Sequence, residues 1–189
     1  LGGGYLRLQP VFPYFLRARL AADPARDAAV KAAFVAHANG YGGALAQLIQ
    51  SKDPRERQLG PALTRVEFEN LYGALRLALA RRERFWGAFD ALFYLLYTQS
   101  AHRENAALCA EVLAAREGYS AGQLAGDEGQ SFLLVLERQA TSSLQIQDFA
   151  AARQHYEQAL QQIPTRQQVS EEWHKRESAT LYHQLGRVA

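Results

Sequence analysis

The chain has a single cysteine, Cys109, and no methionine among its 189 residues. One cysteine cannot form a disulfide within the chain, and a metal site built from several cysteines is excluded. This cysteine usage suits a reducing compartment, so we expect a cytoplasmic location. The missing methionine, even at position 1, favours a fragment of a longer protein, although a processed mature chain would look the same.

Long apolar runs and a strong charge imbalance are also missing. No run of about 18 or more apolar residues occurs, and the start of the chain lacks a charged-then-apolar signal pattern. We therefore expect no membrane association. The formal net charge is +2, from 21 Lys and Arg against 19 Asp and Glu. A sequence pI of about 8.8 then reflects a small imbalance and gives little support to nucleic acid binding.

Alternating runs of β-branched residues, which are typical of half-buried strands, are absent as well. Ala, Leu, Gln, Glu and Arg, which favour helices, supply most of the chain, and the one sheet-like stretch is 5–8. Proline and glycine divide the rest into helices of about 12 to 25 residues, which predicts an all-α fold. The expected helices are 11–22, 25–50 (with a break at 39–43 left open), 60–80, 85–98, 103–116, 130–146, 149–163 and 169–187.

The chain is expected to divide into four parts. The segment 1–24 precedes a helical adaptor at 25–117, four glycines predict a loop at 118–129, and a C-terminal part covers 130–189. Short connections predict antiparallel hairpins. The helix at 85–98 is apolar nearly all round and must be covered on most sides.

The most informative pattern lies near the C-terminal end. One helix carries Ala152, Tyr156, Ala159 and Pro164, at spacings of four, three and five residues, and Ala140 is a small residue of the helix before it. This pattern resembles the tetratricopeptide repeat (TPR), in which small residues let two helices approach closely. An ordinary amphipathic hairpin, with alanines and an aromatic residue at helical spacing, is the alternative.

Two further features extend the TPR resemblance. Asp148 and Phe149 stand at the turn where the repeat commonly has an acidic-aromatic pair, and we expect Phe149 and Tyr156 to fill the space between hairpins. The opening of a second repeat follows at Tyr182, Leu185 and Gly186. The resemblance implies antiparallel helical hairpins stacked as a TPR-like right-handed superhelix.

The same resemblance implies a binding groove, because the first helix of each TPR hairpin lines the inner, concave wall. Carried onto this sequence, the groove positions are Glu137, Thr141 and Gln145 from one helix and Thr180, His183 and Arg187 from the next. They mix donors and acceptors with no uniform sign, which argues against a dedicated acidic or phosphate groove. A protein, a peptide or a small ligand would bind there, and ordinary solvated positions are the alternative.

A wider resemblance covers most of the chain. Residues 5–10 and 14–20 resemble the end of the winged-helix module of STAND-type signal-transduction ATPases and related large bacterial transcriptional regulators, with Gln9 where that family often has His. Residues 67–75 resemble the helix with which their repeat arrays begin, and 85–115 resembles a degenerate first repeat. The resemblance implies a sensor arm that holds a ligand or protein and relays its occupancy to an ATPase module elsewhere. The phosphate-binding Gly-x-x-x-x-Gly-Lys-Ser/Thr sequence is absent from this segment.

We predict no catalytic, cofactor or metal site. The five histidines form no His-Glu-x-x-His pair, and Cys109 lies in an Ala- and Leu-rich helix that favours a packed thiol over a nucleophile. Asn70 is expected to be buried and to bond neighbouring backbone.

Three functions remain open. The first is a protein- or ligand-binding repeat module, and the second is a structural or oligomerisation segment, for which exposed aromatic rings in 85–97 would suit self-association. The third is a helical enzyme, which a pocket gathering His102, Glu104 and Glu111 would support. Nucleic acid binding would need a continuous arginine face, for instance through Arg76, Arg81, Arg82 and Arg84.

Overall fold

The computed structural model describes residue 16, residues 18–162 and residues 171–188. Within these ranges the chain is all-α and contains no strand, which confirms the predicted fold class. The sheet-like stretch 5–8 and the start of the first expected helix lie outside the described residues. The elements are α2 (Pro24–Ile49), α3 (Pro54–Val66), α4 (Phe68–Arg81), α5 (Trp86–Thr98), α6 (His102–Ala114), η1 (Ala115–Gly118), α7 (Ala121–Ala125), α8 (Asp127–Gln145), α9 (Phe149–Gln162) and α10 (Glu171–Val188).

The helix α2 is unbroken over 26 residues. Asp23 begins it, because its Oδ1 accepts a hydrogen bond from the backbone N–H of Arg26 at 3.0 Å. The glycines at 39–43, where a break in the helix was left open, instead allow α2 to cross α5 closely. A Cβ at Gly42 would lie 2.5 Å from the carbonyl oxygen of Gly87 in α5. Glycine here lets two helix backbones touch.

The single helix expected at 60–80 is two helices in the structure, α3 and α4. Asp53 accepts a hydrogen bond from the N–H of Arg55 at 2.8 Å and Pro54 follows it, so α3 begins before the expected start. Pro61 lies inside α3, where its missing N–H costs the helix one hydrogen bond. The prediction treated Pro61 as the opening of a helix and was wrong.

The predicted loop at 118–129 contains α7 and the start of α8. Ser120 and Gln123 form a capping box: the Ser120 hydroxyl accepts from the N–H of Gln123 at 3.3 Å, and Gln123 Oε1 accepts from the N–H of Ser120 at 3.0 Å. A Cβ at Gly129 would overlap the carbonyl of Leu124, so this glycine lets α8 begin directly against α7. Gly129 thus allows close packing, and the prediction of one loop over 118–129 was wrong.

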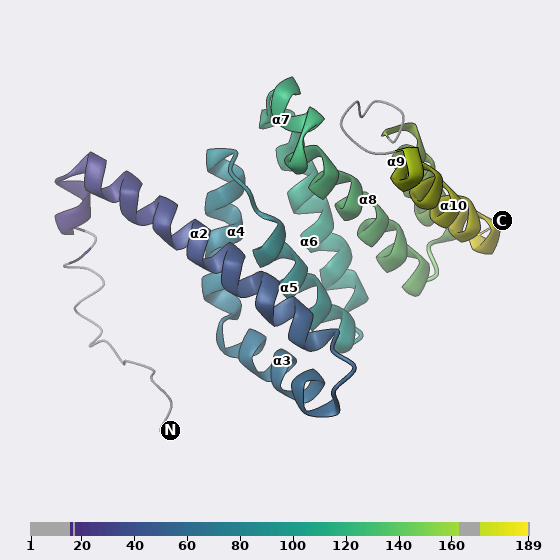
Figure 1. Cartoon of the computed structure of the whole chain (residues 1–189), viewed down its shortest axis with the longest axis horizontal. Coiled ribbons are helices and arrows are strands. Elements are labelled where there is room, and N and C mark those ends of the chain that lie inside the picture. Colours follow the sequence, from purple (N-terminus) through teal and green to yellow (C-terminus); the bar gives the residue numbers. More distant parts are fainter. Residues whose placement is uncertain (1–15, 17, 163–170, 189) are drawn as a thin grey trace.

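The helices lie side by side from α2 at one end of the molecule to α9 and α10 at the other (Figure 1). The most extensive packing joins α2 to α5, α6 to α8 and α8 to α9. Among the described helices, none combines the length and the apolar character needed to cross a membrane.

Two clusters of buried side chains hold the helices together. The large core joins α2, α4, α5, α6 and the first half of α8, and its biggest members are Phe85, Phe89, Phe93 and Phe132. The small core joins α8, α9 and α10 through Leu133, Leu136, Ala140, Tyr156, Ala159 and Leu181. The helix α8 contributes to both cores.

The expectation that the helix at 85–98 is covered on most sides is confirmed, since Phe85, Phe89 and Phe93 are each at most 1% exposed. Tyr97, at the end of α5, is 37% exposed. The oligomerisation hypothesis rested on exposed rings in this segment, and most of these rings fill the large core instead.

Candidate functional site

The six predicted groove residues lie on two helices that share the small core. Glu137 and Thr141 are half-buried on α8, and Gln145, its last residue, is exposed. Thr180 and His183 are exposed on α10. The side chain of Arg187 lies outside the described residues.

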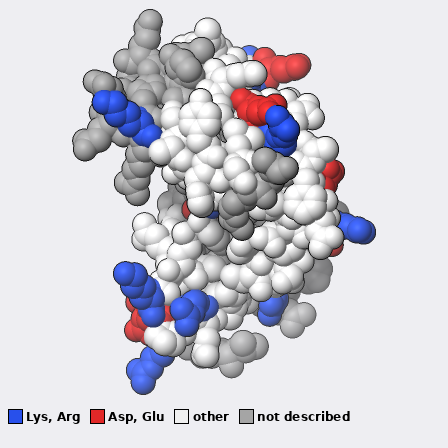
Figure 2. Space-filling model, turned by 90° about the vertical axis from the view of Figure 1, so that its right-hand side faces the viewer, with Lys and Arg blue, Asp and Glu red and all other residues white. Residues whose placement is uncertain are grey.

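The local contacts of this predicted groove are modest. Thr141 Oγ1 donates to the backbone carbonyl of Glu137 at 2.9 Å and lies 3.5 Å from the Tyr156 hydroxyl. Figure 2 views the molecule from the end that carries α9 and α10, where the charged side chains lie mainly toward the edges of the face, in places with both signs side by side. The predicted groove residues stay a prediction, because nothing in this arrangement tests what they bind.

The small residues of the TPR-like pattern pack as expected. Ala140, Ala152 and Ala159 are fully buried and Tyr156 is 2% exposed. Phe149 is 51% exposed, so the expectation that it fills the space between hairpins is wrong. It is the first residue of α9 and follows the end of α8, so it lies at the turn of the hairpin. Pro164 lies outside the described residues.

A second groove, which we call the α4–α6 groove, lies between α4 and α6, with α5 also lining it. Its volume is about 310 Å³. The lining is mainly apolar and includes Phe68 from α4, Leu92 and Leu96 from α5, and Ala107 and Leu108 from α6. The rings of Phe68 and Tyr72 stack one helical turn apart, with centroids 6.2 Å apart, along the α4 side.

Two carboxylates stand on the α6 side of this groove. Tyr72 Oη donates to Glu111 Oε2 at 2.7 Å, and Arg76 Nε lies 3.4 Å from the other oxygen of Glu111. The hydrogen bond to Glu111, together with burial, raises the pKa of the Tyr72 hydroxyl. Glu104 is exposed and has no hydrogen bond or ion pair within the described part of the chain. The groove therefore offers an apolar surface beside one paired and one unpaired carboxylate.

The residues of the enzyme hypothesis are only partly brought together. Glu104 and Glu111 line the α4–α6 groove, but His102 does not. Its ring packs edge-on against Tyr97, with centroids 5.5 Å apart. Within the described residues, no three His, Cys, Asp or Glu side chains form a group that could hold a metal ion.

The arginines that a nucleic acid face would need are partly engaged in ion pairs. Arg76 pairs with Glu111 and Arg81 Nε lies 2.7 Å from Glu83 Oε1. Paired guanidinium groups contribute less to binding a phosphate backbone than free ones do.

A half-buried charge pair connects α5 to α8. Arg138 Nη2 lies 3.8 Å from Asp90 Oδ1 and donates to the Tyr94 hydroxyl at 2.5 Å. The guanidinium also lies over the rings of Phe93 and Tyr94, at 5.0 and 4.7 Å from their centroids. Burial raises the pKa of Asp90 to about 6, and the positive charge of Arg138 opposes only part of this rise. The carboxyl is thus poorly compensated in its charged form.

No protein-family model, curated protein or solved structure matches this chain. The TPR and STAND resemblances therefore stay proposals that rest on the residues named above.

Two single-residue predictions have clear outcomes. Cys109 is fully buried, and burial raises the pKa of its thiol to about 12, so it is a packed thiol as predicted. Asn70 was expected to be buried, but it is exposed and its Nδ2 donates to Glu67 Oε2 at 2.8 Å. Leu71 and Ala74 face the core from α4, and Asn70 falls on the solvent side of the same helix.

Proposed function

We propose that this chain is a helical scaffold that binds a protein or peptide partner and forms part of a larger signalling or regulatory protein. The observation that carries the proposal is the α4–α6 groove, an apolar depression of about 310 Å³ beside the large core. Apolar grooves between helices are a common way to hold an amphipathic segment of a partner.

The charges beside the groove specify the partner further. Glu104 and Glu111 are seven residues apart on α6, which places them about 10 Å apart along the helix axis. Glu104 is unpaired among the described residues, so a partner that brings Lys or Arg gains an ion pair without breaking one. We therefore propose an amphipathic segment with apolar anchors and basic side chains.

We further propose that α8 and α9 are one TPR-like hairpin and that α10 opens the next, within a right-handed superhelix. The support is the burial of Ala140, Ala152, Tyr156 and Ala159 at the repeat spacing. In this proposal the residues predicted to line a concave groove on α8 and α10 form a second contact surface for a partner, and the parent resembles STAND-type regulators of the cytoplasm.

The test uses two fluorescein-labelled amphipathic helical peptides, one of Leu and Lys and one of Leu and Glu, with binding followed by fluorescence polarisation. We expect the Leu–Lys peptide to bind and the Leu–Glu peptide to fail. Ala107→Trp fills the groove and should abolish binding, whereas Ala110→Trp is a matched control, exposed on the same helix but outside the lining. Glu104→Gln should weaken binding several-fold, in the range of about 0.5 to 1 kcal/mol expected for an exposed ion pair.

Equal binding of both peptides would show that charge does not select the partner. Full binding by the Ala107→Trp protein would place the peptide elsewhere on the molecule and remove the groove from the proposal. Far-UV circular dichroism of each variant verifies that the helices are retained.

A further inference from the structure

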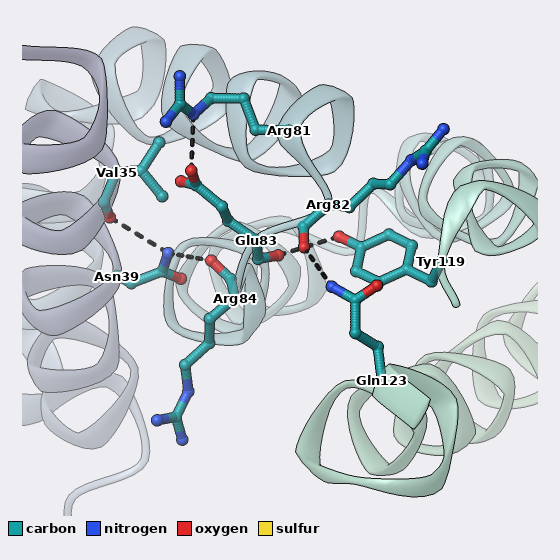
Figure 3. Close-up of polar contacts among 8 residues, drawn as sticks. All are labelled: Val35, Asn39, Arg81, Arg82, Glu83, Arg84, Tyr119 and Gln123. Atoms are coloured by element: carbon teal, nitrogen blue, oxygen red, sulfur yellow. Dashed lines mark hydrogen bonds and ion pairs between the residues drawn. The ribbon is translucent and has the colours of Figure 1, made fainter. Parts of the chain in front are cut away.

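The linker between α4 and α5 is held by side chains from other parts of the chain. The backbone carbonyls of residues 82–84 each accept one hydrogen bond from a side chain distant in sequence (Figure 3). The donors are Gln123 Nε2 to Arg82 at 2.7 Å, Tyr119 Oη to Glu83 at 2.9 Å and Asn39 Nδ2 to Arg84 at 2.5 Å. Three consecutive carbonyls without freedom to turn make this linker a fixed part of the surface.

Asn39 also fixes the start of α5. Its Oδ1 accepts from the N–H of Ala88 at 3.3 Å, and its Nδ2 donates to the carbonyl of Val35 at 3.1 Å as well as to Arg84. One side chain of α2 therefore joins α2, the linker and the first turn of α5. The space between these three elements is bounded by backbone that Asn39 holds through hydrogen bonds.

That space is a pocket of about 510 Å³. Its α2 wall is made of small residues one or two turns apart, including Ala32, Ala36, Gly40 and Gly43. Trp86 and Gly87, at the start of α5, also line it. This volume suits a small organic ligand, since such sites in proteins span about 300 to 1,000 Å³.

The polar side chains at the pocket differ in whether they are already bound to other groups of the protein. Glu83 lines it, but its carboxylate pairs with Arg81 and in Figure 3 points away from Arg84. The amide of Asn39 is fully engaged by backbone. The guanidinium of Arg84 has no hydrogen bond or ion pair among the described residues. The pocket therefore combines apolar walls with one unsatisfied cation.

We propose that this pocket binds a small organic anion, whose apolar body lies between α2 and Trp86 and whose carboxylate or phosphate pairs with Arg84. A guanidinium binds both kinds of group through two parallel N–H···O hydrogen bonds. The pocket shares no lining residue with the α4–α6 groove, so this proposal does not rest on the proposed function.

Trp86 supplies the measurement. The chain has two tryptophans, and Trp173→Phe leaves Trp86 as the single fluorophore, at the wall of the pocket. This single-tryptophan protein is titrated with octanoate, with octyl phosphate and with the neutral 1-octanol. We expect saturable changes in Trp86 emission with the anions and at least about tenfold weaker binding of octanol, because the alcohol lacks a charge-assisted bond.

Two pairs of variants locate the ligand. Arg84→Gln should weaken binding of the anions by about tenfold or more, whereas Arg82→Gln removes a neighbouring arginine that does not line the pocket and should leave it unchanged. Gly40→Leu fills the pocket, and a side chain fits there because nothing lies within 4 Å of the added Cβ. Gly73→Leu, equally unhindered but on α4 and outside the pocket, is its control.

Tighter binding of octyl phosphate than of octanoate identifies a phosphate ligand, and the reverse identifies a carboxylate. The proposal is overturned if neither anion gives a saturable change, if octanol binds as tightly as the anions, or if both Arg84→Gln and Gly40→Leu leave binding unchanged. Arg84 is exposed, so its variant tests the site even if Gly40→Leu does not fold.

Discussion

Two parts of the molecule pack their helices with different kinds of residue. In the large core, α2 and α5 meet through glycines, and phenylalanines such as Phe89 and Phe132 are among the largest buried side chains. Around the small core, alanines such as Ala140 and Ala159 bring α8 and α9 together beside one buried ring, Tyr156. The first arrangement buries more apolar surface, and the second repeats a spacing that is visible in the sequence.

The core that should contribute most to stability is therefore not the core with the more regular sequence pattern. Large buried rings contribute the most free energy per residue, so the large core should dominate the free energy of unfolding. A regular pattern of small residues specifies how helices stack but contributes less burial. The part of the chain that is easiest to interpret from sequence is therefore the part that should open first, and three predictions test this.

The largest effect is expected from Phe89→Ala in the large core. Phe89 is fully buried and packs against Trp86 and Phe93, with ring centroids 5.5 and 6.0 Å away. Removing the ring leaves a cavity, and urea unfolding should show a loss of about 3 to 5 kcal/mol. Leu59→Ala, at a residue 49% exposed on α3, should stay within about 0.5 kcal/mol of the parent protein. Similar losses for the two variants would contradict the packing described for the large core.

A smaller and local effect is expected from Leu181→Ala in the small core. Leu181 is 1% exposed and connects α10 to α8 and α9. The substitution should cost about 2 to 3 kcal/mol, and hydrogen exchange should speed up in α10 while α5 stays protected. Tyr182→Ala, at the next residue and 65% exposed, is the control. Faster exchange throughout α5 would mean that the two cores unfold as one unit.

The smallest effect concerns the charge pair that connects the two parts. The pKa of Asp90 is about 6 in the folded chain and lies near the ordinary value of 3.8 in the unfolded chain. The folded state therefore holds the proton more tightly, so stability falls as pH rises between these values and the cost is fully present above about pH 6. Because the group is partly solvated, we expect a cost of about 1 to 2 kcal/mol.

Asp90→Asn should remove this dependence of stability on pH. Urea midpoints measured at about pH 4.5 and about pH 7.5 should differ less for this variant than for the parent protein. Asp127→Asn changes an exposed carboxylate at the start of α8 and should keep the parent's slope. An unchanged slope in the Asp90→Asn protein would show that burial does not disfavour the charged carboxyl.

The sequence predicted the helices whose ends carry local signals. The apolar run of α5 lies between charged and polar residues, and its expected bounds nearly match Trp86–Thr98. The errors arose at Pro61, which was treated as the start of a helix, and at Gly129, which was assigned to a loop, whereas a break at 39–43 was left open. Gly42 and Gly129 allow backbones to approach closely in three dimensions, and Pro61 is tolerated within α3. Such tertiary roles leave no local signal that separates them from a turn.

The candidate sites were harder to predict than the helices. The spacing of Glu104 and Glu111 places both on one face of α6, and Phe68 and Tyr72 share a face of α4 in the same way. Nothing in these spacings shows that the two faces meet. The burial of Ala140 and Tyr156 followed from a known repeat pattern, whereas the exposure of Phe149 depends on where α8 ends.

The hydrogen bonds that hold the linker 82–84 also bear on the order of folding. Its donors Tyr119 and Gln123 lie 36 and 41 residues further along the chain than the carbonyls they bind. During synthesis, α4 and α5 emerge before these donors, and water alone can satisfy the two carbonyls until the donors arrive. A nascent chain that ends before Tyr119 therefore holds the linker through Asn39 alone, and the segment 118–129 adds the other two hydrogen bonds once it has been synthesised.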